Sequence, residues 1–239
     1  MKRALVTGAS GGIGAAIARQ LARDGLHVIV HAHGHPERAE AVASDIRVAG
    51  GSAETVLFDV ADGDACVAAL EKLLAQSPIQ IVVNNAGIHD DAPLAGMSRQ
   101  QWYRVVDVSL HGFFNVTQPL LLPMLRTRWG RVISVSSIAA VMGNRGQANY
   151  AAAKAGLHGA SKSLALEVAS RGVTVNVVAP GIIQSAMTET VFSAEQIGAM
   201  VPMKRAGTAD EVAHLVSFLA SPRADYISGQ VISINGGMV

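Results

Sequence analysis

The sequence predicts a single α/β domain in which helices cover both faces of one parallel sheet. Short runs rich in Val and Ile alternate with longer segments of helical period along the whole chain, which is typical of consecutive βαβ units. No repeat, low-complexity tract or charged linker interrupts the alternation, so residues 1–239 form one expected domain. Half of the residues are hydrophobic and 15% are charged, which indicates extensive burial or a large subunit interface.

Seven strands and six helices are expected, in alternation. The expected strands are 3–7, 27–31, 54–58, 79–84, 130–136, 174–178 and 230–234, and the expected helices are 13–23, 37–49, 64–76, 101–126, 150–171 and 209–220. Right-handed crossovers between parallel strands place such helices on both faces of the sheet, which makes the fold doubly wound.

The segment 182–208 breaks this rhythm with a Met-rich amphipathic stretch. Ligands of open α/β sheets bind beyond the carboxyl ends of the strands, and this segment follows such an end, so we expect a substrate lid. Its apolar residues suit an acyl chain or pack only on their own core: Met187, Val191, Phe192, Ile197, Met200, Val201 and Met203.

The charge and cysteine content exclude several classes of protein. A formal net charge of +1 indicates neither a nucleic-acid-binding protein nor a polybasic membrane anchor. The apolar run after Arg3 is too short for a signal peptide, and no stretch of about 18 apolar residues predicts a membrane span. The single cysteine, Cys66, cannot form an internal disulfide, which favours a reducing cytoplasmic location. No metal site is expected.

A glycine-rich turn at residues 7–14, Thr-Gly-Ala-Ser-Gly-Gly-Ile-Gly, links the first strand directly to the first helix. The glycines permit a tight turn and a close backbone approach, so that amide groups and the helix N-terminus can face a pyrophosphate. The strand before the turn and the helix after it are the context that a dinucleotide-binding motif requires. The alternative is a tight turn that binds no ligand. The expected contacts are Gly8, Ser10, Gly12, Ile13 and Gly14.

The glycine spacing, with three residues between Gly8 and Gly12 and one before Gly14, resembles the short-chain dehydrogenase/reductase family. The resemblance extends over nearly the whole chain through the run 84–87 (Asn-Asn-Ala-Gly), Ser137, Tyr150, Lys154, Pro180 and Gly181. It implies a Rossmann-type fold and an NAD(P)-dependent oxidoreductase acting on CH–OH or C=O groups. It also implies further cofactor contacts at Asp59, Val60, Asn85, Ala86, Gly87, Tyr150, Lys154, Pro180, Gly181, Ile183 and Ser185.

The end of the second strand favours NADP(H) over NAD(H). An acidic residue that would bond the ribose 2′-hydroxyl of NAD is missing there, and the sequence reads His31, Ala32, His33, Gly34, His35. His33, with Arg38 further on, is a candidate partner for a 2′-phosphate. Gly11 stands where NADP-selecting relatives often carry a basic residue. Alternatively, these histidines form only a solvated turn.

Tyr150 and Lys154 stand four residues apart on one helical segment, so their side chains share a face. A neighbouring ammonium and the positive nicotinamide ring are expected to lower the pKa of the phenol from about 10. Tyr150 then donates a proton to the carbonyl oxygen as hydride reaches the carbon, and Ser137 hydrogen-bonds the same oxygen. A Tyr and a Lys four residues apart are usually ordinary helix neighbours, and Ser137 alone would be a turn residue, but their joint occurrence behind the glycine-rich turn favours catalysis. The resemblance assigns the three roles directly. The substrate contacts expected are Ser137, Gln147 and Tyr150.

One catalytic position departs from the family pattern. Relatives place an Asn on the long helix after the run 84–87, where it holds a water that relays protons to the Lys. Here that position is Ser109, and Asn115 lies too far along the helix to replace it. The relay is water-filled, rerouted through a neighbour such as His111, or slow. We expect an active enzyme with a compromised relay.

Within the family, the stretches 142–154, 167–181 and 226–237 resemble the 3-oxoacyl-[acyl-carrier-protein] reductases. This resemblance implies NADPH-dependent reduction of 3-oxoacyl thioesters, in fatty acid synthesis or in specialised polyene- or polyketide-type synthesis. Arg128 and Arg171 match the family's carrier-docking arginines, beside the expected active-site mouth. Alternatively, both arginines only complement helix dipoles.

Other functions and assemblies stay open. The alternatives are an acetoacetyl-CoA reductase, another short-chain alcohol dehydrogenase acting on a small ketone, sugar or steroid, and a weakly active cofactor-binding subunit that supports a homologous reductase. The apolar helical segments 110–125 and 151–168 resemble those that pair between family subunits. A homo-oligomer, dimer or tetramer, is therefore expected.

Overall fold

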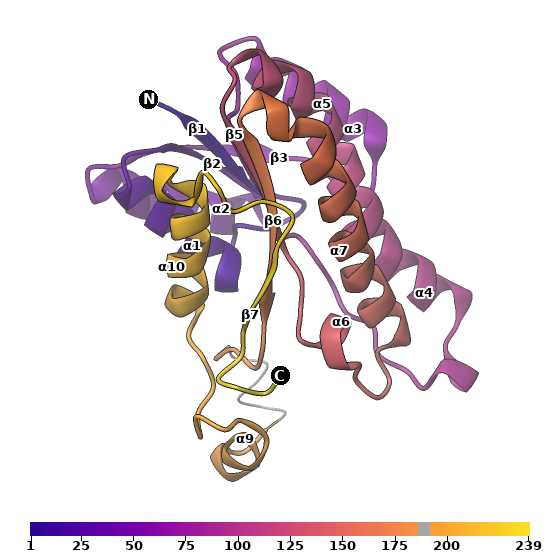
Figure 1. Cartoon of the computed structure of the whole chain (residues 1–239). Coiled ribbons are helices and arrows are strands. Elements are labelled where there is room, and N and C mark those ends of the chain that lie inside the picture. The colour runs from indigo at the N-terminus through magenta and orange to yellow at the C-terminus, as the bar shows by residue number, and fades with distance from the viewer. Residues whose placement is uncertain (186–191) are drawn as a thin grey trace.

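The computed structural model describes residues 1–185 and 192–239 and contains one seven-stranded parallel sheet (Figure 1). The strand order is β3-β2-β1-β4-β5-β6-β7. The strands are β1 (Arg3–Val6), β2 (His27–Ala32), β3 (Ser52–Leu57), β4 (Ile81–Asn84), β5 (Gly130–Val135), β6 (Val173–Pro180) and β7 (Val231–Ile234). The strand order reverses between β1 and β4, which is the position at which doubly wound sheets bind ligands. The predicted fold class is confirmed.

Helices cover both faces of the sheet (Figure 1). One face carries α1 (Gly12–Arg23), α2 (Pro36–Val48) and α10 (Ala209–Ala220), and the other carries α3 (Gly63–Leu74), α4 (Arg99–Val106), α5 (Gly112–Arg126) and α7 (Ala148–Val168). The short helices α6 (Ala139–Met142) and α9 (Ala194–Met200) lie near the carboxyl ends of the strands. No helix among the described residues has the length and apolarity needed to cross a membrane.

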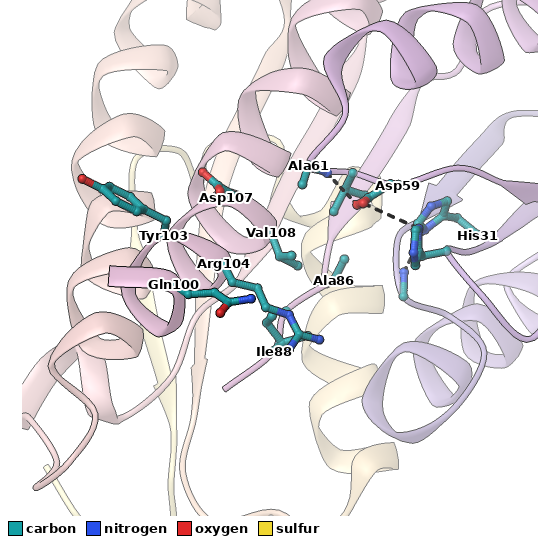
Figure 2. Close-up of a pocket in the computed structure, with 14 residues that line it drawn as sticks. His31, Asp59, Ala61, Ala86, Ile88, Gln100, Tyr103, Arg104, Asp107 and Val108 are labelled. Atoms are coloured by element: carbon teal, nitrogen blue, oxygen red, sulfur yellow. Dashed lines mark hydrogen bonds and ion pairs between the residues drawn. The ribbon is translucent and has the colours of Figure 1, made fainter. Parts of the chain in front are cut away.

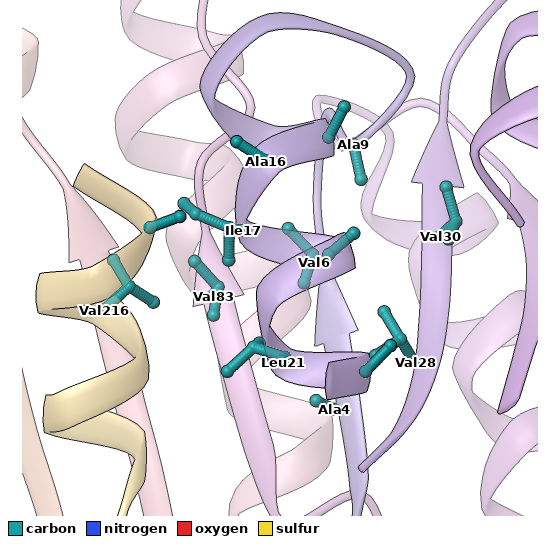
Figure 3. Packing of buried hydrophobic residues seen from close by; sticks show 14 of the residues in the cluster. Ala4, Val6, Ala9, Ala16, Ile17, Leu21, Val28, Val30, Val83 and Val216 are labelled. Atoms are coloured by element: carbon teal, nitrogen blue, oxygen red, sulfur yellow. The ribbon is translucent and has the colours of Figure 1, made fainter. Parts of the chain in front are cut away.

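The sheet separates two hydrophobic cores. On the face of α1, fully buried Ile17 and Leu21 pack with Val6, Val83 and Val216 (Figure 3). Branched side chains fit the pleated surface of the sheet, and the alanines of α1 let the helix approach it closely. Burial of one such side chain contributes about 1.5–3 kcal/mol. The second core lies beneath α3, α5 and α7, so both faces hold the strand ends in fixed positions.

Most element boundaries differ by one to three residues from the sequence-based expectation, and two differences bear on the site. Strand β6 runs on to Pro180, two residues beyond the predicted end. The helix expected over 101–126 is interrupted by a π-helical turn at Asp107–His111, between α4 and α5. A π turn adds a residue to the helical repeat and is frequent at functional sites.

The two ends of the segment predicted to be a lid lie next to each other at the edge of the sheet. Ile183 pairs with Gly207, and the Gly207 N–H donates to the carbonyl of Ile182 at 2.9 Å. Helix α9 lies between these ends. Met187 and Val191 lie outside the described residues, and the closing function of the segment stays a prediction.

Candidate active site

The predicted catalytic and cofactor-binding residues gather at the carboxyl edge of the sheet. The glycine-rich turn follows β1, Asn85 follows β4, Ser137 follows β5, and Pro180 ends β6. Because all strands are parallel, these ends meet at one edge. Helix α7 brings Tyr150 and Lys154 to the same edge, close to its N-terminus.

The conformation of the turn requires glycine at particular positions. Gly8 and Gly12 have φ of +62° and +54°, in the left-handed region. A Cβ at Gly14 would lie 2.3 Å from the Gly8 carbonyl oxygen. At Gly11 the backbone is extended, and nothing lies within 4 Å of an added Cβ. Positions 8, 12 and 14 therefore require glycine, whereas position 11 can accommodate a side chain.

Hydrogen bonds fix the turn against β4. The Thr7 hydroxyl oxygen accepts from the N–H groups of Asn85 and Ala86, each at 3.0 Å. The Asn85 side-chain amide donates to the carbonyls of Thr7 at 2.9 Å and Gly8 at 3.1 Å. The turn is therefore held by the protein's own groups.

A cavity of about 630 Å³ adjoins the turn (Figure 2). Six of the predicted cofactor residues line it: Gly8, His33, Asp59, Val60, Ala86 and Gly87. Figure 2 shows His31 and Asp59 at one end and Gln100 and Tyr103 of α4 at the other. The glycine-rich turn and the adjoining cavity together fit a dinucleotide.

Two of the predicted cofactor residues that line this cavity, His33 and Asp59, lie close to each other. His33 Nδ1 lies 3.8 Å from Asp59 Oδ2, and the other Asp59 oxygen accepts from the Ala61 N–H at 2.9 Å. Asn115 donates to the Val60 carbonyl at 2.9 Å. Asn115 thus supports the cofactor side of the edge and, as predicted, does not replace the missing Asn.

The other predicted cofactor residues lie on the same edge. The Pro180 carbonyl accepts from the Ile138 N–H at 2.7 Å, next to Ser137. A Cβ at Gly181 would lie 2.8 Å from Asn235 of the turn after β7. Ile183 is buried where the predicted lid begins, and Ser185 follows it. Ser10 and Ile13 belong to the turn and to α1.

Ser137, Tyr150 and Lys154 come together in space. The Tyr150 phenol and the Ser137 hydroxyl lie close enough for Ser137 to lower the pKa of the phenol. The Lys154 ammonium donates to the Val135 carbonyl at 2.9 Å and lies 5.8 Å from the centre of the Tyr150 ring. Lys154 is only 3% exposed. The end of β5 and one face of α7 therefore build a single catalytic cluster.

The electrostatics of this cluster correct one expectation. Burial raises the pKa of Tyr150, the Ser137 hydroxyl opposes this, and the nearby Asp91 carboxylate adds to it. The predicted lowering by Lys154 is not found, because the Lys154 ammonium donates to the Val135 carbonyl. The lowering expected from a bound nicotinamide ring stays a prediction. Burial lowers the pKa of Lys154 to about 8. The phenol is consequently protonated at neutral pH, as a proton donor must be.

Two residues that sequence reasoning missed fix α7 against β5. The Ser136 hydroxyl donates to the Lys154 carbonyl at 3.0 Å, and His158 Nε2 lies 2.8 Å from the Ser136 hydroxyl oxygen. Ser136 immediately precedes Ser137, so Val135, Ser136 and Ser137 all contact the catalytic helix. No local spacing reveals this contact between a strand end and a distant helix.

Ser109 lies in the π-helical turn and is 4% exposed. Among the described residues, its hydroxyl has no hydrogen-bond partner. A Cβ at Gly87 would lie 2.9 Å from the Lys154 ammonium and 3.6 Å from the Ser109 hydroxyl, so both groups face the same small region. His111 is exposed, and its Nδ1 lies 2.8 Å from the Asp107 carboxylate.

The mouth beside Tyr150 is organised by amide side chains. Gln147 donates to Asp91 at 2.8 Å and accepts from Asn144 at 2.9 Å. Asn149 donates to the Asp90 carbonyl at 2.9 Å and accepts from the Tyr150 N–H at 2.8 Å. Gln147 therefore lies at the start of the catalytic helix, where a substrate contact is possible.

Arg128 and Arg171, which were expected beside the mouth of the active site, lie at the opposite edge of the sheet. Arg128 precedes the first residue of β5, and Arg171 precedes the first residue of β6. At about 3.3 Å per residue, the six-residue β5 separates this edge from Ser137 by about 20 Å. Both arginines lie at the amino edge of the sheet, so within one chain they do not border the cleft.

The chain matches the family described as short chain dehydrogenase over residues 2–196 and belongs to that family. It is an oxidoreductase of the short-chain dehydrogenase class, as the sequence predicted.

Three relatives carry the name 3-oxoacyl-[acyl-carrier-protein] reductase FabG. The chain is 46% identical to that of Staphylococcus aureus and 45% identical to that of Staphylococcus epidermidis, covering 99% of this chain and 98% of each relative. It is 45% identical to that of Escherichia coli (strain K12), over 99% of this chain and 97% of the relative.

Proposed function

We propose that the chain reduces 3-oxoacyl thioesters carried by acyl carrier protein to 3-hydroxyacyl thioesters, with NADPH as reductant, in fatty acid or in specialised polyene- or polyketide-type synthesis. The meeting of Ser137, Tyr150 and Lys154 beside the glycine-rich turn is the observation that carries this proposal. The names of the relatives support the substrate class.

Each residue of the cluster has a distinct role in the proposed reduction. Bound NADPH supplies a hydride to the 3-oxo carbon. The carbonyl oxygen accepts hydrogen bonds from the Tyr150 and Ser137 hydroxyls, which polarise it. Tyr150, protonated because its pKa is raised, gives its proton to this oxygen. Lys154 would bind the nicotinamide ribose of the cofactor, as the resemblance to the family implies.

The proton that Tyr150 loses must be restored through its surroundings. The buried Ser109 hydroxyl and the Lys154 ammonium face the same region beside Gly87. We propose that a proton reaches Lys154 through this region. A serine hydroxyl is shorter than an amide side chain, which is why the relay is expected to be slow.

The choice of NADPH over NADH rests on the end of β2. No acidic residue stands at positions 31–35, and His33 borders the cavity. An acidic side chain there would repel a 2′-phosphate, whereas a histidine accepts it.

A homo-oligomer, with a tetramer as the proposed form, would explain the surface of α5 and α7. Phe114 and Leu122 on α5 are 63% and 65% exposed, and Leu166 on α7 is 85% exposed. Large exposed apolar side chains on neighbouring helices are typical of subunit interfaces. Arg128 and Arg171 can dock an acidic carrier for a cleft only if that cleft belongs to a neighbouring subunit. A cytoplasmic location remains part of the proposal, supported by the lone, buried Cys66.

The test is oxidation of NADPH by the purified protein against 3-oxoacyl groups on acyl carrier protein, on coenzyme A and in small free ketones, with NADH as the matched cofactor. We expect the highest kcat/KM with the carrier-bound thioester and NADPH. Equal use of a sugar, steroid or small ketone would favour a general alcohol dehydrogenase, and a preference for the coenzyme A thioester would favour an acetoacetyl-CoA reductase. No turnover with any of them would favour the supporting subunit.

A second assay isolates the carrier. Arg128→Glu and Arg171→Glu are each expected to raise KM for the carrier-bound substrate about tenfold while leaving a small ketone mimic unchanged. Arg23→Glu, at the end of α1 on the opposite face, is the matched control. A loss shared by both substrates would contradict carrier docking.

A further inference from the structure

His31 lies directly beneath the glycine-rich turn. It is the fifth residue of β2 and is 1% exposed. Its ring packs against Phe58, with the ring centres 4.1 Å apart. The sequence marked His31 only as part of a possible phosphate-binding region. Both of its ring nitrogens are bonded within the protein, which points to a role in the turn itself and not in a bond to a 2′-phosphate.

Both ring nitrogens of His31 have defined partners. Nδ1 accepts from the Gly8 N–H at 3.1 Å, and Nε2 donates to the Phe58 carbonyl at 2.9 Å. A backbone amide can only donate and a carbonyl can only accept, so one neutral tautomer, protonated on Nε2, satisfies both bonds. His31 therefore joins the first glycine of the turn to the end of β3.

Gly8 is held from two sides by these contacts. Its N–H is bound by His31, and its carbonyl accepts from the Asn85 side chain at 3.1 Å. The next amide, of Ala9, donates to the His31 carbonyl at 2.8 Å. Because Gly8 has the left-handed φ that only glycine adopts readily, its peptide orientation depends on such contacts.

We propose that His31 is a positioning residue for the nicotinamide cofactor: its Nδ1 fixes the orientation of Gly8, and through it the affinity of the turn for the pyrophosphate. This inference rests on the proposed function for the identity of the cofactor. It does not depend on the carbonyl substrate.

The surroundings of the ring keep it neutral. Burial lowers the pKa of His31 from 6.5 to about 4, the bond to Phe58 opposes this, His33 adds to the lowering, and Asp59 opposes it. A protonated ring would present an N–H to the Gly8 N–H and would break that bond. At neutral pH the acceptor is therefore always available.

Two isosteric substitutions separate the two hydrogen bonds. In His31→Asn the side-chain oxygen stands near the place of Nδ1, so the bond to Gly8 is kept and the bond to Phe58 is lost. In His31→Gln the terminal amide reaches the place of Nε2, so the bond to Phe58 is kept and Gly8 loses its acceptor. Ile29→Ala, two residues earlier on the same strand and fully buried in the core, is the control for a purely structural defect.

The measurement is the Kd for NADPH, from cofactor fluorescence without any carbonyl substrate, together with the melting temperature of each variant. We expect His31→Gln to raise the Kd about tenfold, because one buried hydrogen bond is lost. The Kd of His31→Asn should stay within about threefold of that of the wild type. Ile29→Ala should lower the melting temperature without raising the Kd for NADPH.

Equal loss in the Asn and Gln variants, or wild-type affinity in the Gln variant, would overturn the inference. Failure of the wild type to bind either NADPH or NADH would instead overturn the proposed function.

The pH dependence of the folding stability provides a second, independent test. Between pH 6.5 and 4 the unfolded chain takes up a proton at His31 that the folded chain does not, so stability falls as the pH is lowered. This part of the decline should vanish in His31→Asn, and its persistence would contradict the neutral ring.

Discussion

At the glycine-rich turn the buried polar groups of the protein bind one another, whereas beside Lys154 a buried hydroxyl has no protein partner. The side chains of Thr7, His31 and Asn85 all form hydrogen bonds with the backbone of the turn or of neighbouring strands. Ser109, on the carbonyl side of the same edge, is equally buried, yet its hydroxyl has no partner among the described residues. Buried polar groups normally have partners.

This difference separates binding from chemistry. The cofactor side is rigid before anything binds, because its shape depends on contacts inside the protein. On the carbonyl side, the Ser109 hydroxyl has no partner in the part of the chain that the structure describes, so it is free to take part in the proposed proton transfer. Substitutions on the two sides should accordingly change different measured quantities, cofactor affinity on one side and turnover on the other.

The largest effect is expected from Tyr150→Phe, which removes the proton donor and keeps the ring. We expect kcat to fall by about 10³-fold, within the range for a lost general acid. The Kd for NADPH should change by less than about threefold, since a single hydrogen bond contributes little net free energy. A variant that retains a tenth of wild-type turnover would contradict the role of the phenol.

A smaller effect is expected from Gly14→Ala on the cofactor side. The added Cβ would meet the Gly8 carbonyl oxygen at 2.3 Å and the Asn85 amide at 2.5 Å, so the turn must move. We expect the Kd for NADPH to rise more than about tenfold, as for other strained packing in a tight site. Gly11→Ala, where an added Cβ meets nothing within 4 Å, is the control and should bind normally. Equal effects at both positions would show that the turn is adaptable.

A gain of comparable size is expected from Gly11→Arg. Gly11 has an extended φ of 178° and open space around it, so an arginine fits without strain. A charge-assisted bond to the 2′-phosphate should strengthen NADPH binding about tenfold and leave NADH unchanged. The ratio of the two Kd values is the quantity to measure. An equal change for both cofactors would contradict the position assigned to the phosphate.

The smallest effect is expected from Ser109→Asn. The longer amide side chain would reach further into the region shared with Lys154, so proton transfer should become easier and kcat should rise about two- to fivefold. Turnover that stays equal or falls would show that the site is adapted to serine.

Much of this arrangement follows from sequence pattern. The alternation of strand and helix predicts all seven strands, because each βαβ unit repeats the same local signal. The catalytic residues are predictable because Tyr150 and Lys154 share one helix face and the glycine-rich turn is continuous in sequence. Helical period cannot reveal the π turn at Asp107–His111, since one extra residue in a long apolar segment leaves the pattern almost unchanged.

The remaining errors concern contacts between distant segments. The pKa of Tyr150 depends on burial and on the direction in which Lys154 bonds, and neither is encoded in their spacing. The resemblance placed Arg128 and Arg171 beside the mouth, but each precedes its strand and therefore lies at the amino edge of the sheet, away from the cleft of its own chain. His31 contacts Gly8 and Phe58 across two neighbouring strands, which only the sheet brings together.

The central claim is that one chain passes a hydride from NADPH to the 3-oxo carbon while Tyr150 protonates the oxygen. The most direct measurement is a single turnover with NADPH that carries deuterium at both C4 positions, followed by mass spectrometry of the thioester product. We expect deuterium on C3 of the 3-hydroxyacyl group with the wild-type protein, and no labelled product in the same time with Tyr150→Phe. Product without deuterium, or label transferred equally well by the Phe variant, would contradict the mechanism.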